Sequence, residues 1–201
     1  MKEQDARDQI GFITQVIEDS MGILTENGAF YILWGVLIVL GAAATFASLQ
    51  LGRTGTLLWI WLAVYLLGAA GVVLVTRRNR QRHPKTLARR VYVSTWAAIG
   101  FCGLVLGVCA IVTNKIPLEV GFSLMAGLLG IAYYVNAAMN RNRWMTGLAF
   151  GWWAGAGALF FLPARFAPLA LCLLVLALEL VPGIVLVARR PRARPAEERR
   201  R

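Results

Sequence analysis

The sequence predicts an all-α fold: a polytopic membrane bundle of six transmembrane helices, preceded by a cytoplasmic amphipathic helix, with both termini in the cytoplasm. Of the 201 residues, 58% are hydrophobic, which is more than a soluble domain of this size can hide from water. Six apolar stretches reach the roughly 20 residues that a helix needs to cross a hydrocarbon core. The chain is also basic, with a net charge of +11, yet 29 of its 31 charged side chains lie outside these stretches.

Residues 1–28 form the first expected element, an amphipathic helix on the cytoplasmic side. Its apolar residues recur at helical spacing and form a stripe of Ile10, Ile13, Ile17, Met21 and Leu24. Helices that lie on lipid usually present Lys and Arg, whereas this segment has six acidic and two basic residues. Two interpretations remain open: the stripe lies on the bilayer, or it docks on protein, namely its own spans, a second copy or a separate cytoplasmic partner.

The transmembrane domain is expected over residues 29–188. Breaks between spans are marked by Gly55, Pro117, Pro163 and the polar run 140–143, because such residues end helices. The expected spans are 30–49, 56–75, 93–112, 118–139, 144–162 and 166–187. Five tryptophans near span ends are expected in the interfacial belts of the membrane: Trp34, Trp59, Trp61, Trp96 and Trp144.

Positive charge predicts the orientation, since Lys and Arg in short loops stay on the cytoplasmic side. With the N-terminus inside, 18 of the 21 Lys and Arg are cytoplasmic. Seven form a basic face in the loop after the second span, namely Arg77, Arg78, Arg80, Arg82, Lys85, Arg89 and Arg90, and seven lie in the tail, 189–201, which is expected to be disordered. We interpret both segments as topology determinants that also contact anionic lipid headgroups.

The basic segments allow two other interpretations. Nucleic-acid binding is not expected, because the basic runs lack interleaved aromatic residues and a folded domain to present them. The acidic N-terminal helix, however, has the charge to cover the basic loop.

Glu179 is the candidate for an intramembrane polar site, because an ionisable residue at bilayer depth is costly to keep there. It lies near the middle of the sixth span, and no Lys or Arg lies at a similar depth, so a neutral, hydrogen-bonded carboxylic acid is expected. Its candidate partners by depth are Tyr65, Trp152, Trp153, Tyr133 and Asn136. As structure, Glu179 joins helices through hydrogen bonds; as function, it is a proton or cation site, and the lack of relay partners favours the structural interpretation.

Catalysis, metals and cofactors are not expected. The chain has no Asp after Asp19 and no His in any span, which removes paired-Asp metal sites, bis-His haem ligation and a Ser/His dyad. Two GxxxG spacings, Gly103 with Gly107 and Gly151 with Gly155, allow close helix approach. They favour packing within the chain over formation of a homo-oligomer, which nothing else in the sequence supports.

Three segments carry a family resemblance: "IGFITQVIEDSMGILTENGAFYILWGVLIVLG", "LLGIAYYVNAAMNRNRWMTGLAFGWW" and "LVPGIVLVARR". Together they resemble a bacterial family of uncharacterised multi-pass membrane proteins, in which an amphipathic helix leads into an "LLWGW"-like first span. Here that motif reads "ILWGV" and lacks the second Trp. The resemblance implies a bacterial plasma (inner) membrane location, with genes often placed near winged-helix regulators, and it transfers no catalytic residue.

These observations predict an integral plasma-membrane protein without catalytic activity, which regulates or scaffolds through its cytoplasmic face. The alternative is a small proton- or cation-coupled transporter that uses Glu179.

Overall fold

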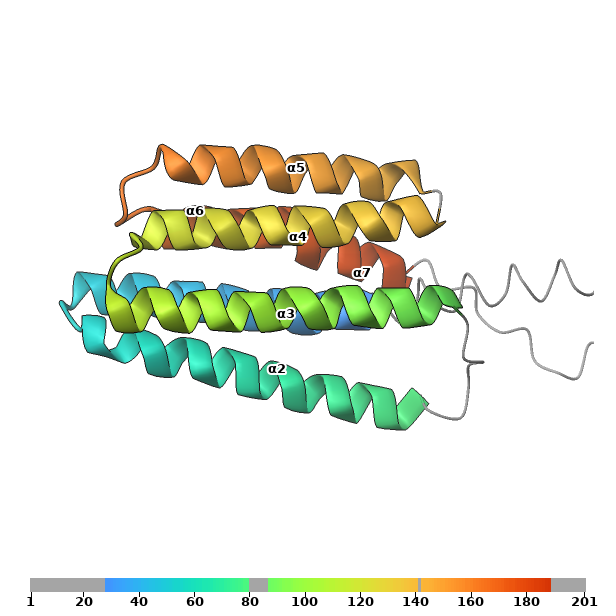
Figure 1. Ribbon diagram of the computed structural model, residues 1–201, viewed down its shortest axis with the longest axis horizontal. Coiled ribbons are helices and arrows are strands. Elements are labelled where there is room, and N and C mark those ends of the chain that lie inside the picture. The colour runs from blue at the N-terminus through green and yellow to red at the C-terminus, as the bar shows by residue number, and fades with distance from the viewer. Residues whose placement is uncertain (1–27, 80–86, 141, 189–201) are drawn as a thin grey trace, which may run out of the picture.

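The computed structural model describes residues 28–79, 87–140 and 142–188, and within these ranges the chain is helical without a strand. Six helical rods lie alongside one another (Figure 1). The first is the helix Gly28–Gln50, followed by the 3₁₀ helix η1 (Thr54–Thr56), α2 (Leu57–Asn79), α3 (Leu87–Thr113), α4 (Leu118–Asn140) and α5 (Arg143–Phe160). The last rod joins α6 (Ala167–Val175), a π-helical segment (Leu176–Leu180) and α7 (Val181–Ala188).

The all-α prediction is confirmed, and five of the predicted spans are long and apolar enough to cross a membrane. These five are Gly28–Gln50, Thr54–Arg77, Arg90–Thr113, Leu118–Met139 and Ala167–Ala188. The fifth predicted span coincides with α5, which is not among them. It has 18 residues, begins with Arg143 and contains four glycines and three tryptophans, which lower its mean hydropathy.

Three short connections, residues 51–56, 114–117 and 161–166, lie together at one end of the bundle, which we call the short-loop end (Figure 1). Two of them reverse the chain through left-handed residues, Gly52 with φ 66° and Asn114 with φ 51°, conformations that Gly and Asn adopt most readily. The first rod begins and the last rod ends at the opposite end. Six rods therefore bring both ends of the described chain to the same side.

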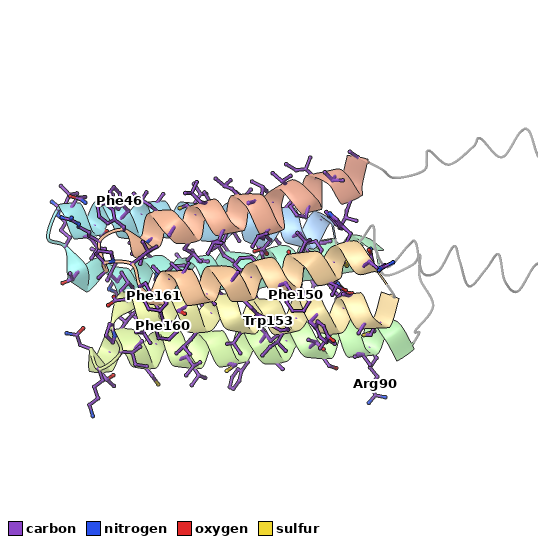
Figure 2. The ribbon with its side chains drawn as sticks, turned by 90° about the horizontal axis from the view of Figure 1, so that it is seen from above. Phe46, Arg90, Phe150, Trp153, Phe160 and Phe161 are labelled. Carbon is purple, nitrogen blue, oxygen red and sulfur yellow. The ribbon has the colours of Figure 1, made fainter. Side chains whose placement is uncertain are left out.

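The outer surface of the bundle is apolar over most of its length, as the outward-pointing side chains in Figure 2 show. Large side chains such as Trp59, Leu66 and Phe101 are about 70% exposed, at 71%, 70% and 70%, and Phe161 is 90% exposed. Soluble monomers rarely expose so many large apolar side chains together. The surface is compatible with a protein embedded in a membrane.

Small residues allow α5 to pack closely within the bundle. A Cβ added at Gly151 or Gly155 would press on Leu178 or Leu174 of the last rod. On the neighbouring side, the Ser123 hydroxyl of α4 donates a 2.5 Å hydrogen bond to the carbonyl of Ala156. Packing within the chain, as the GxxxG spacing in this helix predicts, is therefore confirmed.

The first rod packs against the last rod through glycine. A Cβ added at Gly183 would lie 2.9 Å from Cβ of Tyr31 and 3.1 Å from the backbone nitrogen of Ile32. A Cβ added at Gly28 would likewise lie 2.8 Å from Cγ2 of Val187 on the last rod. Gly183 lies four residues, about one helical turn, after Glu179. The contact with Gly183 therefore brings Tyr31 close to Glu179.

Several sequence predictions lie wholly or partly outside the described residues. The N-terminal stripe and the tail 189–201 belong to this group, as do Arg80, Arg82 and Lys85 of the basic face. Within the described chain, Arg77 and Arg90 are exposed, and Figure 2 shows Arg90 pointing away from the bundle.

Candidate functional site

Glu179 lies in a π-helical segment, where the last rod departs from α-helical geometry. The Val181 N–H bonds to the carbonyl of Leu176, five residues earlier. Pro182 has no N–H to offer the carbonyl of Leu178, and its ring would crowd that carbonyl in a regular α-helix. The wider turn accommodates the proline, and π-bulges of this kind are frequent at functional positions.

The Glu179 carboxyl faces the interior of the bundle, and the residue is 1% exposed. It lies close enough to Tyr31 of the first rod and Tyr133 of α4 to interact with both side chains electrostatically. The described Lys and Arg residues all lie in connections or near helix ends. Burial of an unpaired charge is costly, which favours a neutral carboxyl at this position. The neutral hydroxyl groups of the two tyrosines form its polar surroundings.

Tyr31 is the centre of a polar network that joins three rods. Asn136 of α4 donates a 2.7 Å hydrogen bond from Nδ2 to the Tyr31 hydroxyl. Tyr92 of α3 lies close enough to interact with the Tyr31 side chain. Tyr31 and Asn136 are each 2% exposed, so the network is shielded from solvent. A hydrogen bond in such a protein interior is electrostatically stronger than one in water.

Aromatic rings enclose the network. Tyr31 stacks on Tyr133 with centroids 5.2 Å apart, and Trp96 of α3 meets both rings edge-on at 5.8 and 5.9 Å. Trp152 of α5 lies against Tyr133 at 6.2 Å. These distances fall in the range of favourable aromatic pairs. We call the set Tyr31, Tyr92, Trp96, Tyr133, Asn136, Trp152 and Glu179 the aromatic–carboxyl cluster; it draws on every rod except α2.

Four polar atoms of this cluster are buried without a partner at hydrogen-bond geometry: Glu179 Oε2, Tyr133 Oη, Trp96 Nε1 and Trp152 Nε1. Tyr133 and Trp152 are nevertheless close enough to interact. Buried polar groups are nearly always satisfied in proteins, so a concentration of this kind marks a specialised part of the interior.

Three of the five predicted partners of Glu179, namely Tyr133, Asn136 and Trp152, belong to the cluster, and two do not. Tyr65 packs edge-on against Trp34 at 6.1 Å, and its hydroxyl lies 2.8 Å from the position that a Cβ on Gly103 would take, so it belongs to the contact between α2 and α3. The Trp153 indole donates a 3.2 Å hydrogen bond to the carbonyl of Gly127. Its ring packs beside Phe150 at 5.4 Å, as Figure 2 shows on α5.

The sequence did not predict Tyr31, Tyr92 and Trp96 as neighbours of Glu179. Tyr31 and Tyr92 lie near helix ends, so a count of depth along each span separates them from Glu179. Trp96 was expected in an interfacial belt, but its indole nitrogen is buried within the cluster. By contrast, Trp59 and Trp144 are 71% and 45% exposed near helix ends, as an interfacial position requires. The spacing of Tyr92 and Trp96, one turn apart on α3, was the available signal.

A cavity of about 680 Å³ lies elsewhere in the bundle, between the first rod and α2, α3 and α4. Tyr65 lines it, whereas Glu179 and the other members of the aromatic–carboxyl cluster do not. Among the described residues, no group of three or more His, Cys, Asp or Glu is arranged to hold a metal ion. The contacts that the structure gives for the cluster are a hydrogen bond, aromatic packing and electrostatic contact between helices.

Comparisons of the chain with protein-family models, with curated proteins and with solved structures give no match. The resemblance to a multi-pass membrane family thus rests on the quoted motifs.

Proposed function

We propose that this protein is a six-span membrane protein, with both termini in the cytoplasm, that acts without catalysis by regulating or scaffolding a partner at its cytoplasmic face. The distribution of charge carries this proposal: 18 of 21 Lys and Arg belong to one side of the predicted topology. Connections of four to six residues at the short-loop end leave no room for a domain there. The proposed membrane is the bacterial plasma membrane.

The proposal counts α5 as the sixth span. At 18 residues it is about 27 Å long, close to the thickness of a hydrocarbon core of about 30 Å. It lies along α4 between the same two ends of the bundle (Figure 1). Phe150 and Phe160 expose 58% and 52% of their surface on its outer side, so the helix has a face suited to lipid. Two of its glycines, Gly151 and Gly155, serve packing against the last rod.

Within this proposal the aromatic–carboxyl cluster is a structural joint that fixes the rods. The enclosure of Glu179, at 1% exposed, and its place outside the lining of the cavity support this role. A transport role needs an aqueous route to the carboxyl. Vesicles containing the protein are expected to show no pH-driven proton or cation flux, with the Glu179→Gln variant as the matched comparison; flux that the variant abolishes would support transport instead.

The regulatory role is tested through the N-terminal stripe. Ile13→Ser with Ile17→Ser removes apolar surface from the stripe, while Gln4→Ser with Gln15→Ser changes the opposite side of the predicted helix and serves as the control. We expect the first pair to lose a cytoplasmic protein that crosslinks to the intact protein in its native membrane, and the control to retain it. An identical set of crosslinked proteins for both pairs would reject a partner that binds the stripe.

A further inference from the structure

The cavity described above is an apolar crevice that opens toward the short-loop end. Its lining on the first rod, α2 and α3 runs from the helix ends at that side inward to Trp34, Tyr65 and Leu104. Trp61 of α2 and Phe122 of α4 face each other in its wall, with centroids 5.6 Å apart. The volume of about 680 Å³ is in the range of small-molecule sites.

The inner end of the crevice is closed where three helices converge. A Cβ added at Gly103 of α3 would lie 2.7 Å from Sδ of Met125 and 2.8 Å from the Tyr65 hydroxyl. The lined wall extends about 12 Å on α2, from Leu57 to Tyr65, and about 17 Å on α4, from Leu118 to Leu129. On the first rod it reaches about 22 Å, from Leu49 to Trp34. These walls are all shorter than a hydrocarbon core of about 30 Å, and those of α2 and α4 are close to one leaflet.

Open space adjoins two glycines of the lining. A Cβ added at Gly107 of α3 or at Gly121 of α4 would meet no atom within 4 Å, and both residues line the crevice. Larger side chains at these two positions would fill the crevice without displacing a neighbour. Gly100 of α3 and Gly127 of α4 are equally open and are not part of the lining, so they provide matched controls on the same helices.

The mouth of the crevice is polar and positively charged. Thr54, Asn114 and Lys115 line it, and Lys115 is exposed. The other two basic residues of the short-loop end, Arg53 and Arg165, directly adjoin lining residues Thr54 and Ala164 in the sequence. A basic mouth above an apolar interior is complementary to an amphiphile with an acidic head and a hydrocarbon chain.

We propose that the crevice binds one acyl chain of an anionic phospholipid from the leaflet at the short-loop end, with the lipid phosphate at Lys115. The depth of the α2 and α4 walls favours this occupant over a long polyprenyl chain, and the apolar wall disfavours a water-soluble solute. The inference rests on embedding in a membrane, but it does not depend on which side the short-loop end faces or on a cytoplasmic partner.

Native mass spectrometry of the full chain, titrated with phosphatidylglycerol, measures this binding. Phosphatidylcholine with the same acyl chains is the neutral comparison. We expect phosphatidylglycerol to bind more tightly, and Gly107→Leu with Gly121→Leu to weaken its binding at least about tenfold, because the site is filled. Gly100→Leu with Gly127→Leu should bind as the unchanged protein does. Equal binding by the filled and control variants would overturn the proposal.

Lys115→Gln tests the headgroup contact separately, and its exposed position makes it independent of folding. Loss of one charge near the lipid surface should weaken phosphatidylglycerol binding about fivefold and leave phosphatidylcholine unchanged. Equal affinity for the two lipids in the unchanged protein would overturn the assignment of an anionic head. Tighter binding of a polyprenyl phosphate than of phosphatidylglycerol would overturn the assignment of the chain.

Discussion

The amide of Asn136 donates a 2.7 Å hydrogen bond to the hydroxyl of Tyr31, which ties α4 to the first rod across 105 residues of sequence. Tyr31 in turn stacks on Tyr133 and lies beside Glu179. Tyr31 thus accepts a hydrogen bond from the amide of Asn136 and lies within electrostatic reach of the Glu179 carboxyl, two groups that the sequence could only place at similar depths.

Tyr31→Phe removes the shared hydroxyl and keeps the ring. We expect it to lower the free energy of unfolding by about 1 kcal/mol, the usual value of an interhelical hydrogen bond in a membrane protein. The measurement is reversible unfolding in mixed micelles with increasing SDS. Tyr134→Phe is the control, because Tyr134 is 45% exposed on the same helix as Asn136. Equal losses in the two variants would show that the Tyr31 hydroxyl has no special role.

Substitutions of Glu179 separate hydrogen bonding and volume from charge. Glu179→Gln keeps the shape and the polar atoms without a titratable group, so a structural joint should lose less than about 1 kcal/mol. Glu179→Ala leaves a cavity and removes the polar contacts, and it should cost about 2 kcal/mol or more. The same unfolding assay applies. A Gln variant as unstable as the Ala variant would contradict a joint that depends on the volume and polar contacts of a neutral side chain.

Gly183→Ala probes the contact between the first and last rods. The new methyl group would meet Tyr31 and the backbone of Ile32, and because backbone cannot yield as a flexible side chain does, we expect a loss of about 1–3 kcal/mol. Gly147→Ala places the same methyl group on α5 with no atom within 4 Å and should change little. If both variants unfold at the same SDS concentration, the rods do not depend on this contact.

Much of the fold was predictable from the sequence because the apolar stretches and their breaks are unambiguous. Pro117 and Pro163 mark connections in the structure as they did in the sequence pattern. The structure differs from the prediction at α5, which is not among the five helices long and apolar enough to cross a membrane. Its Trp and Gly residues lower its mean hydropathy. Two of its glycines lie against Leu174 and Leu178 of the last rod, and sequence periodicity does not reveal this contact.

The candidate site was less predictable, since it depends on rotations and rod offsets. Burial at bilayer depth singled out Glu179, but depth alone grouped it with Tyr65, which faces α3 instead. Tyr31 joined the site because Gly183 allows the first rod to approach, a contact between residues far apart in the chain. The π-helical turn at Glu179 follows from Pro182 only once the helix is known to continue past it.

Six spans with a shared cytoplasmic side for both termini is the central claim, and cysteine accessibility in intact cells tests it most directly. After replacement of Cys102, Cys109 and Cys172, single cysteines at Lys115 and Ala164 should react with a membrane-impermeant maleimide from outside. Cysteines at Arg90 and Asn142 should react only after the membrane is permeabilised. Labelling of Ala164 and Asn142 from the same side would show that α5 does not cross the membrane and would contradict the account.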